Sequence, residues 1–210
     1  MSTYHQQLAR QKRAAIVDAA TALFLESGYD GTSLARIADA AGVSKATLFK
    51  QFPTKAELFD AIVTDYWRAG DGAVTPPEGK PAEGLAALGH RYVALLTRPG
   101  MVALFRIVIA EAPRFPELGR TQFRLGKMPF FESVRDYLAA EHEAGTVVVP
   151  DPVLTASQFL GMISDFAFWP RMLLVDWAPT AQAMANAVDE AVETVLARHA
   201  VTAAGGAARA

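Results

Sequence analysis

Residues 33–55 read SLARIADAAGVSKATLFKQFPTK, two short helical patterns with a glycine between them. In the first pattern Leu34, Ile37 and Ala38 recur at helical spacing, which predicts one apolar face. Gly42 follows this pattern, and a glycine after a helix adopts the positive φ of a C′ residue at no steric cost. We therefore expect the first helix to end in a tight turn at Gly42.

The second pattern begins at Ser44, whose hydroxyl is placed to cap a helix that ends near Gln51. Leu48 is its inward apolar position, because a helix this short is stable only when it packs on its neighbours. The side chains expected on the outer face are polar or basic: Lys45, Thr47, Lys50 and Gln51. Two short helices joined by a glycine-containing turn predict a helix-turn-helix, the motif that places its second helix in the DNA major groove.

A longer stretch, residues 28–59, resembles the N-terminal domain of TetR/AcrR-family transcriptional regulators. It reads GYDGTSLARIADAAGVSKATLFKQFPTKAELF, against a family pattern of roughly G(Y/F)xxT(S/T)(V/L)xxIAxxAGVSxGTLYxxFxxKxxLF. The resemblance implies a DNA-binding regulator, most often a repressor that a small-molecule effector releases from a palindromic operator. It also implies a homodimer.

Ten residues are expected to contact double-stranded DNA: Thr32, Ser33, Ser44, Lys45, Ala46, Thr47, Phe49, Lys50, Gln51 and Lys55. By resemblance, four of these occupy positions that usually hold the DNA backbone: Thr32, Phe49, Gln51 and Lys55. From side-chain chemistry, lysine can donate to guanine, glutamine can pair with adenine, and alanine or threonine methyl groups can meet the thymine methyl. Lys45 suits either a base or a phosphate.

Three positions depart from the family pattern. Phe49 stands where the family usually has tyrosine, so no hydroxyl reaches a phosphate there, Gln51 replaces a frequent histidine or tyrosine, and Ala46 replaces a frequent glycine. These differences leave docking on DNA intact, but they leave the operator sequence undetermined.

Charge is distributed unevenly along the chain. The net charge is −2, yet residues 1–55 carry seven basic and four acidic side chains, so the excess of positive charge lies at the predicted DNA-binding end. The chain has no cysteine, and its opening residues lack the apolar segment of a secretory signal. No apolar stretch is long enough to span a bilayer. We therefore expect a cytoplasmic protein that does not enter the membrane.

The helical pattern continues on both sides of the motif and predicts an all-α fold. A first helix is expected at residues 4–27, and a fourth at residues 54–70, where Thr54 and Glu57 form a capping box. The predicted organisation is a DNA-binding domain at 1–55 that the fourth helix connects to the rest, a Gly/Pro-rich linker at 71–81, a helical effector-binding and dimerisation domain at 82–200, and a tail at 201–210.

In the second domain, helices are expected at residues 82–97, 101–112, 117–144, from 151 or 152 to about 170, and 180–199. Pro129 should kink or break the third of these. The last helix carries apolar residues around more than half of its circumference, which predicts a cover on its second side. The resemblance implies that the last two helices pair with their symmetry mates in a homodimer.

Seven residues of this domain and its junction are candidates to line an effector pocket: Trp67, Arg106, Met128, Phe131, Met162, Phe166 and Trp169. Aromatic residues at helical spacing can equally be ordinary core. Arg106 interrupts an apolar helix, and if it is buried it must be paired with a carboxylate or an anionic ligand.

Other classes of function are less well supported. The four histidines are far apart in sequence and form no metal-binding motif, no catalytic motif is recognised, and no metal or cofactor is expected, so an enzyme is not predicted. A helical small-molecule-binding module without DNA recognition remains the alternative. The operator sequence, the effector, the regulated genes, activation as against repression, and whether the pocket is occupied are not determined by the sequence.

Overall fold

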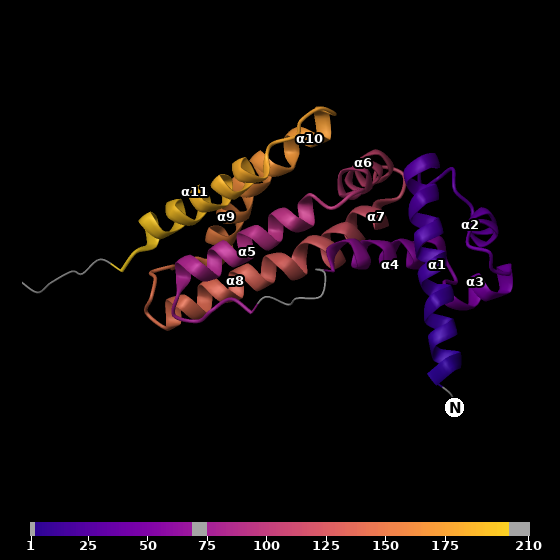
Figure 1. Cartoon of the computed structure of the whole chain (residues 1–210), viewed down its shortest axis with the longest axis horizontal. Coiled ribbons are helices and arrows are strands. Elements are labelled where there is room, and N and C mark those ends of the chain that lie inside the picture. The colour runs from indigo at the N-terminus through magenta and orange to yellow at the C-terminus, as the bar shows by residue number, and fades with distance from the viewer. Residues whose placement is uncertain (1–2, 69–74, 202–210) are drawn as a thin grey trace, which may run out of the picture. The chain divides into compact units, whose positions relative to one another are not determined.

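The computed structural model of the chain describes residues 3–68 and 75–201, and Figure 1 shows its helices in chain order. They are α1 (Thr3–Ser27), α2 (Leu34–Ala40), α3 (Lys45–Gln51), α4 (Lys55–Trp67), α5 (Pro81–Leu96), α6 (Met101–Glu111), α7 (Pro116–Thr121), the π-helical η1 (Gln122–Lys127), α8 (Met128–Glu143), α9 (Pro152–Ala167), α10 (Trp169–Leu173) and α11 (Ala181–His199). Within the described residues there is no β-strand, only an isolated bridge between Val147 and Ala200. The predicted all-α fold is confirmed.

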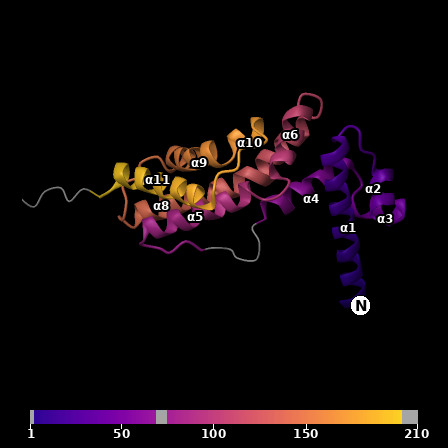
Figure 2. The same ribbon diagram turned by 45° about the horizontal axis from the view of Figure 1, so that its top comes forward.

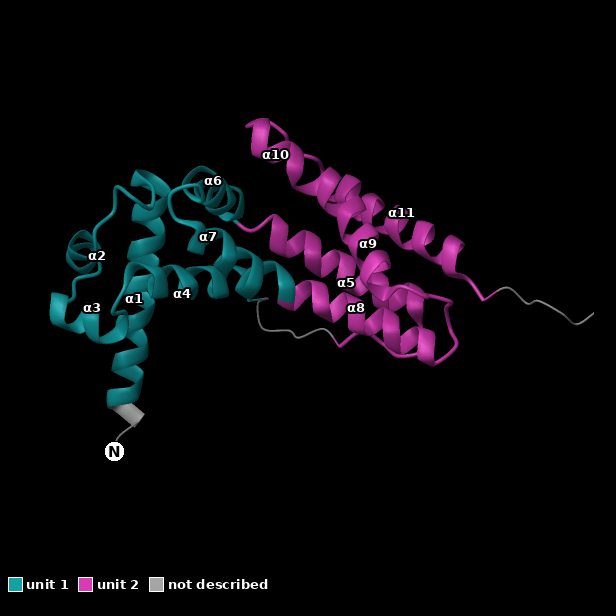
Figure 3. Ribbon diagram, turned by 180° about the vertical axis from the view of Figure 1, so that it is seen from behind, with its two compact units in different colours: residues 1–68, 99–128 teal, residues 69–98, 129–210 magenta. Residues whose placement is uncertain are grey.

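The chain divides into two compact units, shown in different colours in Figure 3. The first contains residues 1–68 and 99–128, and the second contains residues 69–98 and 129–210. This division differs from the predicted boundary at 71–81, because α6 contacts α1, and α7 and η1 contact α4. Part of the predicted linker and of the predicted tail lies outside the described residues.

The first unit is built around the apolar faces of α1 and α4. Ile16, Ala20 and Phe24 repeat at helical spacing on α1 and are buried. On α4, the buried residues are Leu58, Phe59, Ile62, Val63 and Trp67. α2 and α3 lie together beside α1 in both views (Figures 1 and 2), so the helix-turn-helix rests on this core.

The predicted break at Pro129 takes the form of a π-helical stretch directly before it. The backbone N–H of Met128 donates to the carbonyl of Phe123, five residues back. Proline has no N–H to donate, and it disturbs the α-helical ladder of the turn that precedes it. The wider i→i+5 pattern therefore carries the chain from α7 into α8 without leaving a helical conformation.

In the second unit, α11 packs against α5 and α9, and Figures 1 and 2 show the three helices lying alongside one another. Its buried residues are Met184, Val188, Ala191, Val192, Val195 and His199. The outward positions include Asp189, Glu190 and Glu193, which are charged and exposed. Ala187 and Leu196 of the same helix are half-buried, so the expected cover on its second side stays a prediction.

No single described helix is long and apolar enough to cross a membrane, although the bent pair α5 and α6 passes the same length and composition test when taken together.

Close helix packing in the second unit depends on Gly89 of α5. A Cβ at this position would lie 2.5 Å from Cγ1 of Val188 and 3.3 Å from Cδ1 of Ile163. We expect Gly89→Ala to lower the free energy of unfolding by about 1–3 kcal/mol, measured by urea denaturation. Gly119→Ala is the matched control: its Cβ would meet only the Cβ of Ala112, at 3.8 Å, so stability should stay level or rise by up to about 1 kcal/mol. Equal effects of the two substitutions would contradict this packing.

Candidate nucleic-acid interface

The turn between α2 and α3 has the geometry that the sequence predicts. Gly42 has a φ of 64°, in the left-handed region. Its N–H donates to the carbonyl of Asp39 at 3.2 Å, and the N–H of Val43 donates to the carbonyl of Ala38 at 3.0 Å. This pair of bonds is the Schellman motif, which satisfies two of the last carbonyls of α2 and sets the direction in which the chain leaves the helix.

The N-terminus of α3 is capped by Ser44. The Ser44 hydroxyl accepts a hydrogen bond from the backbone N–H of Thr47 at 3.1 Å and lies 2.9 Å from the Thr47 hydroxyl. Because the hydroxyls of Ser44 and Thr47 already contact each other, a phosphate contact by either one would be made by a partly satisfied group. Their roles on DNA stay predictions.

The outer face of α3 is accessible, and its inner face is buried. Leu48 is fully buried, as predicted, while Phe49 keeps 50% of its surface exposed. Lys45, Ala46 and Lys50 are exposed, and Thr47 and Gln51 are half-buried. The side chains with base-reading chemistry therefore lie on the side of α3 away from the core.

Ser33 and the neighbouring Thr32 have different structural roles: one caps α2, and the other bonds to the end of α1. Ser33 caps α2, accepting from the N–H of Arg36 at 3.2 Å, and remains exposed. Thr32 is 1% exposed, and its hydroxyl donates to the carbonyls of Gly28 at 2.9 Å and Leu23 at 3.1 Å. In this structure the buried Thr32 hydroxyl satisfies carbonyls at the C-terminal end of α1, and its expected contact with the DNA backbone stays a prediction.

Lys55, the first residue of α4, points back into the protein. Its Nζ donates to the carbonyl of Tyr29 at 2.6 Å and of Thr32 at 3.1 Å, and it lies 4.3 Å from the centre of the Tyr29 ring. Burial lowers the pKa of the Lys55 ammonium, and the carboxylates of Asp30 and Glu111 oppose this shift. In this structure Lys55 therefore joins α4 to the α1–α2 turn, and its expected phosphate contact stays a prediction.

The capping box expected at the start of α4 forms with one difference. Thr54 accepts from the N–H of Glu57 at 3.1 Å, as predicted. The Glu57 carboxylate accepts from the Thr54 hydroxyl at 3.1 Å, and so this end is held by side-chain contacts.

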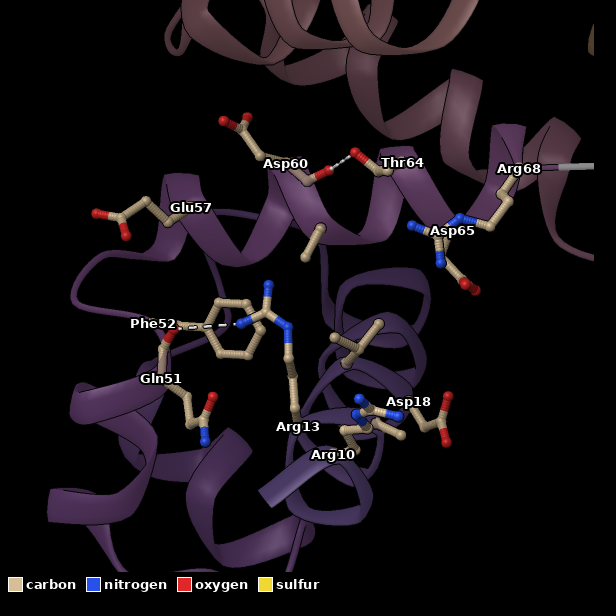
Figure 4. Close-up of a pocket in the computed structure, with 13 residues that line it drawn as sticks. Arg10, Arg13, Asp18, Gln51, Phe52, Glu57, Asp60, Thr64, Asp65 and Arg68 are labelled. Atoms are coloured by element: carbon tan, nitrogen blue, oxygen red, sulfur yellow. Dashed lines mark hydrogen bonds between the residues drawn. The ribbon is translucent and has the colours of Figure 1, made fainter. Parts of the chain in front are cut away.

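Arg13 is a residue that sequence reasoning did not connect to α3. Its guanidinium lies 4.2 Å from the centre of the Phe52 ring, and Nη1 donates to the carbonyl of Gln51 at 3.4 Å, drawn as a dashed line in Figure 4. It thereby holds the C-terminus of α3 against α1. No spacing in the sequence could have paired these residues, because they are 38 residues apart and meet only in the fold.

A cavity of about 570 Å³ lies beside this contact, between α1, the end of α3, and α4 (Figure 4). The wall from α1 carries Arg10, Arg13 and Asp18, and the wall from α4 and its C-cap carries Glu57, Asp60, Asp65 and Arg68. Both walls carry charges of both signs, so the basic side chains of α1 form part of a mixed surface.

A second contact that the sequence did not reveal reaches the α1–α2 turn from α6 and the α6–α7 loop. Arg114 pairs with Asp30 at 3.0 Å, and Glu111 accepts from the N–H of Asp30 at 3.3 Å. The Phe115 ring packs edge-on against Tyr29, with centroids 5.2 Å apart. These residues connect the C-terminus of α6 to the loop that positions α2.

The candidate pocket residues fall in both units: Trp67, Arg106 and Met128 in the first, and Phe131, Met162, Phe166 and Trp169 in the second. Trp67 is buried, and Met128, Phe131, Met162 and Phe166 are half-buried. Arg106 is exposed on α6, so the inference that a buried arginine needs an anionic partner does not apply to it. Trp169 keeps 47% of its surface exposed.

An exposed, polar and basic helix on a capped turn, within an all-helical chain, defines a helix-turn-helix DNA-binding regulator. Residues 16–62 match the family described as "Bacterial regulatory proteins, tetR family". Residues 83–201, more than half of the chain, match "AefR-like transcriptional repressor, C-terminal domain". The chain belongs to the TetR family of bacterial regulatory proteins, and it is a DNA-binding transcriptional regulator.

Individual relatives agree with this assignment. The HTH-type transcriptional regulator YvkB of Bacillus subtilis (strain 168) is 25% identical over 169 residues, covering 77% of this chain and 83% of YvkB. RutR of Escherichia coli (strain K12) is 43% identical over 61 residues, which span only 28% of this chain and 29% of RutR. The structure of the flavonoid-responsive regulator FrrA aligns with a TM-score of 0.75 at 28% identity, covering 91% of this chain and 98% of that one. These names indicate a transcription regulator rather than an enzyme, and they do not favour the alternative of a binding module without DNA recognition.

The contacts of Lys55 give a stability prediction. Lys55→Met keeps the aliphatic stem but leaves the Tyr29 and Thr32 carbonyls without their donor, so the free energy of unfolding should fall by about 1–3 kcal/mol. Lys45→Met, on the exposed face of α3, should change it by no more than about 0.5 kcal/mol. Urea denaturation measures both. If Lys55→Met kept wild-type stability while the salt dependence of DNA binding became shallower by about one unit, Lys55 would be a phosphate contact instead.

Tyr29 gives a prediction at alkaline pH. Burial, with smaller contributions from Glu117 and Asp60, raises the pKa of the Tyr29 phenol from 10.0 to about 12. Between pH 10 and pH 12 the folded state therefore keeps this proton whereas the unfolded chain loses it. The contribution of the protonated Tyr29 phenol to the free energy of unfolding is complete below pH 10 and is lost as pH rises towards 12. The expected slope is at most about 1.4 kcal/mol per pH unit.

Urea denaturation of wild type and Tyr29→Phe at intervals from pH 9 to pH 12 measures this loss. The phenylalanine keeps the ring contacts, and Tyr92 and Tyr137, whose pKa values burial also raises, are present in both proteins. Above pH 10 the wild type should therefore lose stability steadily relative to Tyr29→Phe. A constant difference over the whole range would contradict the assignment.

Proposed function

We propose that this protein represses transcription from a palindromic operator in the bacterial cytoplasm and that a small-molecule effector releases it. The observation that carries this proposal is the exposed outer face of α3, held outward by the buried Leu48 and by the caps at Gly42 and Ser44. A helix in this setting can enter a major groove without first unfolding or turning over.

Within α3, the side chains divide by chemistry. Lys50 and Gln51 lie in the C-terminal turn and supply a donor for guanine and a paired donor and acceptor for adenine. Lys45 lies in the first turn, beside the positive end of the helix dipole, where a phosphate oxygen is favoured. Phosphate contacts supply affinity and orientation, whereas contacts to base edges select the sequence.

The proposed homodimer forms through the last two long helices, α9 and α11. Val153 and Leu154 of α9 are more than half exposed, and a Cβ at Gly161 would meet nothing within 4 Å. The outward residues Asp189, Glu190 and Glu193 of α11 would repel their copies, so α9 supplies the apolar part of the contact. A two-fold axis would present two α3 helices about one DNA turn apart, which matches a palindrome.

Release by an effector requires a ligand that binds one conformation better than the other. The contacts of α6 and the α6–α7 loop with Tyr29 and Asp30 provide a direct physical route from these elements to the loop before α2. The relative FrrA is named as flavonoid-responsive, which supports an organic small molecule as the effector class here. These two observations support the proposal that one part of the chain contacts DNA and another part binds the effector.

Binding to DNA taken from immediately upstream of the protein's own gene tests the proposal, by fluorescence anisotropy at a series of salt concentrations. We expect two chains per duplex and a logarithm of affinity that falls linearly with the logarithm of salt concentration. Lys45→Ala should weaken binding to all sequences, whereas Lys50→Ala or Gln51→Ala should change the preferred bases by about 1–3 kcal/mol per position.

Lys80→Ala is the matched control, since this exposed lysine pairs with Glu83 in the second unit. It should leave both affinity and salt dependence unchanged. The proposal would be refuted if a single chain bound each duplex, or if DNA affinity depended on neither salt concentration nor sequence.

A further inference from the structure

Three polar side-chain atoms of the first unit are buried with no hydrogen-bond partner among the residues that the structure describes. They are the indole Nε1 of Trp67 and both amide atoms, Oε1 and Nε2, of Gln122. Trp67 is 8% exposed and Gln122 is 5% exposed. Because buried polar groups are nearly always satisfied, a set of unsatisfied ones close to each other calls for a partner from outside the chain.

Both side chains are placed by the π-helical stretch η1: Gln122 belongs to it, and Trp67 packs on its Gly126. A Cβ at Gly126 would lie 2.4 Å from Trp67 Nε1 and 2.7 Å from Cδ1, so the indole rests directly on this glycine. Gln122 precedes Gly126 by four residues, close to one turn of a π-helix, and therefore leaves the same face of η1. The indole N–H and the amide thus belong to one place in the fold. Single π-helical turns are frequent at functional sites.

The neighbouring residue shows that this helix interface can satisfy a polar group when the chain supplies a partner. Thr121 is also buried, and its hydroxyl donates to Oδ1 of Asp60 on α4 at 2.6 Å. Trp67 lies on the same helix, α4, yet neither it nor Gln122 has such a partner among the described residues. A leucine at position 122 would bury a similar volume without leaving an amide unsatisfied.

We propose that Trp67 and Gln122 form the polar end of the effector site, an inference that rests on the proposed function. They offer three N–H donors, one from the indole and two from the amide, and one oxygen acceptor, which a hydroxyl or a carboxamide complements by accepting and donating at once. The Phe105 ring packs against the Trp67 ring with centroids 6.3 Å apart, so the surface beside these polar groups is aromatic and favours a ligand with an apolar, aromatic body.

The ligand head group is neutral. Neither Trp67 nor Gln122 carries a charge, and Asp60, which accepts from Thr121 next to Gln122, would oppose an anion. Burying an unpaired ion here would be far more costly than burying a neutral group that forms the missing hydrogen bonds. The class is therefore a neutral aromatic alcohol or aromatic amide.

The test uses the full-length protein labelled with 15N and four probes: phenol, benzamide, toluene and benzoate. The three tryptophans give three indole N–H resonances, and Trp67→Phe identifies the one from Trp67. Phenol or benzamide should move this resonance downfield, because a new acceptor then binds the indole proton. Toluene, which cannot accept, and benzoate, which is charged, should leave it in place.

Two substitutions sharpen the test. Gln122→Leu should weaken binding of phenol or benzamide by about tenfold, the loss of one good hydrogen bond, and should raise the Tm of the ligand-free protein because it removes an unsatisfied amide. Gln11→Leu, on the exposed face of α1, is the matched control and should change neither quantity.

A Trp67 resonance that responds identically to all four probes, or to none, overturns the inference, as does a lower Tm for Gln122→Leu, since the amide would then be bonded to ordered water or protein. Binding of wild-type protein to operator DNA, measured separately, distinguishes the two proposals. DNA binding without any response to phenol or benzamide refutes only the site, whereas a specific response without DNA binding refutes the repressor and leaves the site standing.

Discussion

The ammonium of Lys55, held by two backbone carbonyls, is the contact on which the arrangement of the DNA-binding helices depends. Apolar packing between α1 and α4 is strong, but it is non-directional and permits small rotations of one helix against the other. Hydrogen bonds from Lys55 to Tyr29 and Thr32 are directional, and they connect the first residue of α4 to the loop that begins α2. They therefore determine where the helix-turn-helix begins relative to the core.

Around this contact the aromatic rings of Phe24, Tyr29, Phe59 and Phe115 form a continuous cluster. It joins α1, the α1–α2 turn, α4 and the α6–α7 loop within one unit. A packed cluster of this kind responds to a displacement as a whole, because its rings leave little unoccupied space into which one member could move alone. The contacts of α6 and the α6–α7 loop with Tyr29 and Asp30 therefore connect these elements to the α1–α2 turn.

Buried polar groups in the first unit are of two kinds. Thr32 and Thr121 donate to protein oxygens and stabilise the fold. Trp67 and Gln122 are equally buried but have no such oxygen or donor among the described residues, so they raise the free energy of the ligand-free state. A ligand that completes these hydrogen bonds gains affinity for the conformation that contains them, which is the differential affinity an effector requires.

Short-range chemistry made much of this protein predictable from its sequence. The left-handed turn at Gly42, the caps at Ser44 and Thr54, the inward Leu48, and the disturbance before Pro129 all follow from interactions within about one helical turn. The succession of helices and the family pattern were visible for the same reason. The burial of Thr32 and the exposure of Arg106 were not predictable from the sequence, because burial depends on which distant helix covers a residue.

Three contacts join residues whose sequence spacing gives no sign that they meet. They are Arg13 on Phe52, Lys55 on the α1–α2 turn, and Glu111 and Arg114 at Asp30. Only the tertiary structure decided these contacts, because a long charged side chain takes whichever carbonyl, ring or carboxylate the packed helices bring within its reach.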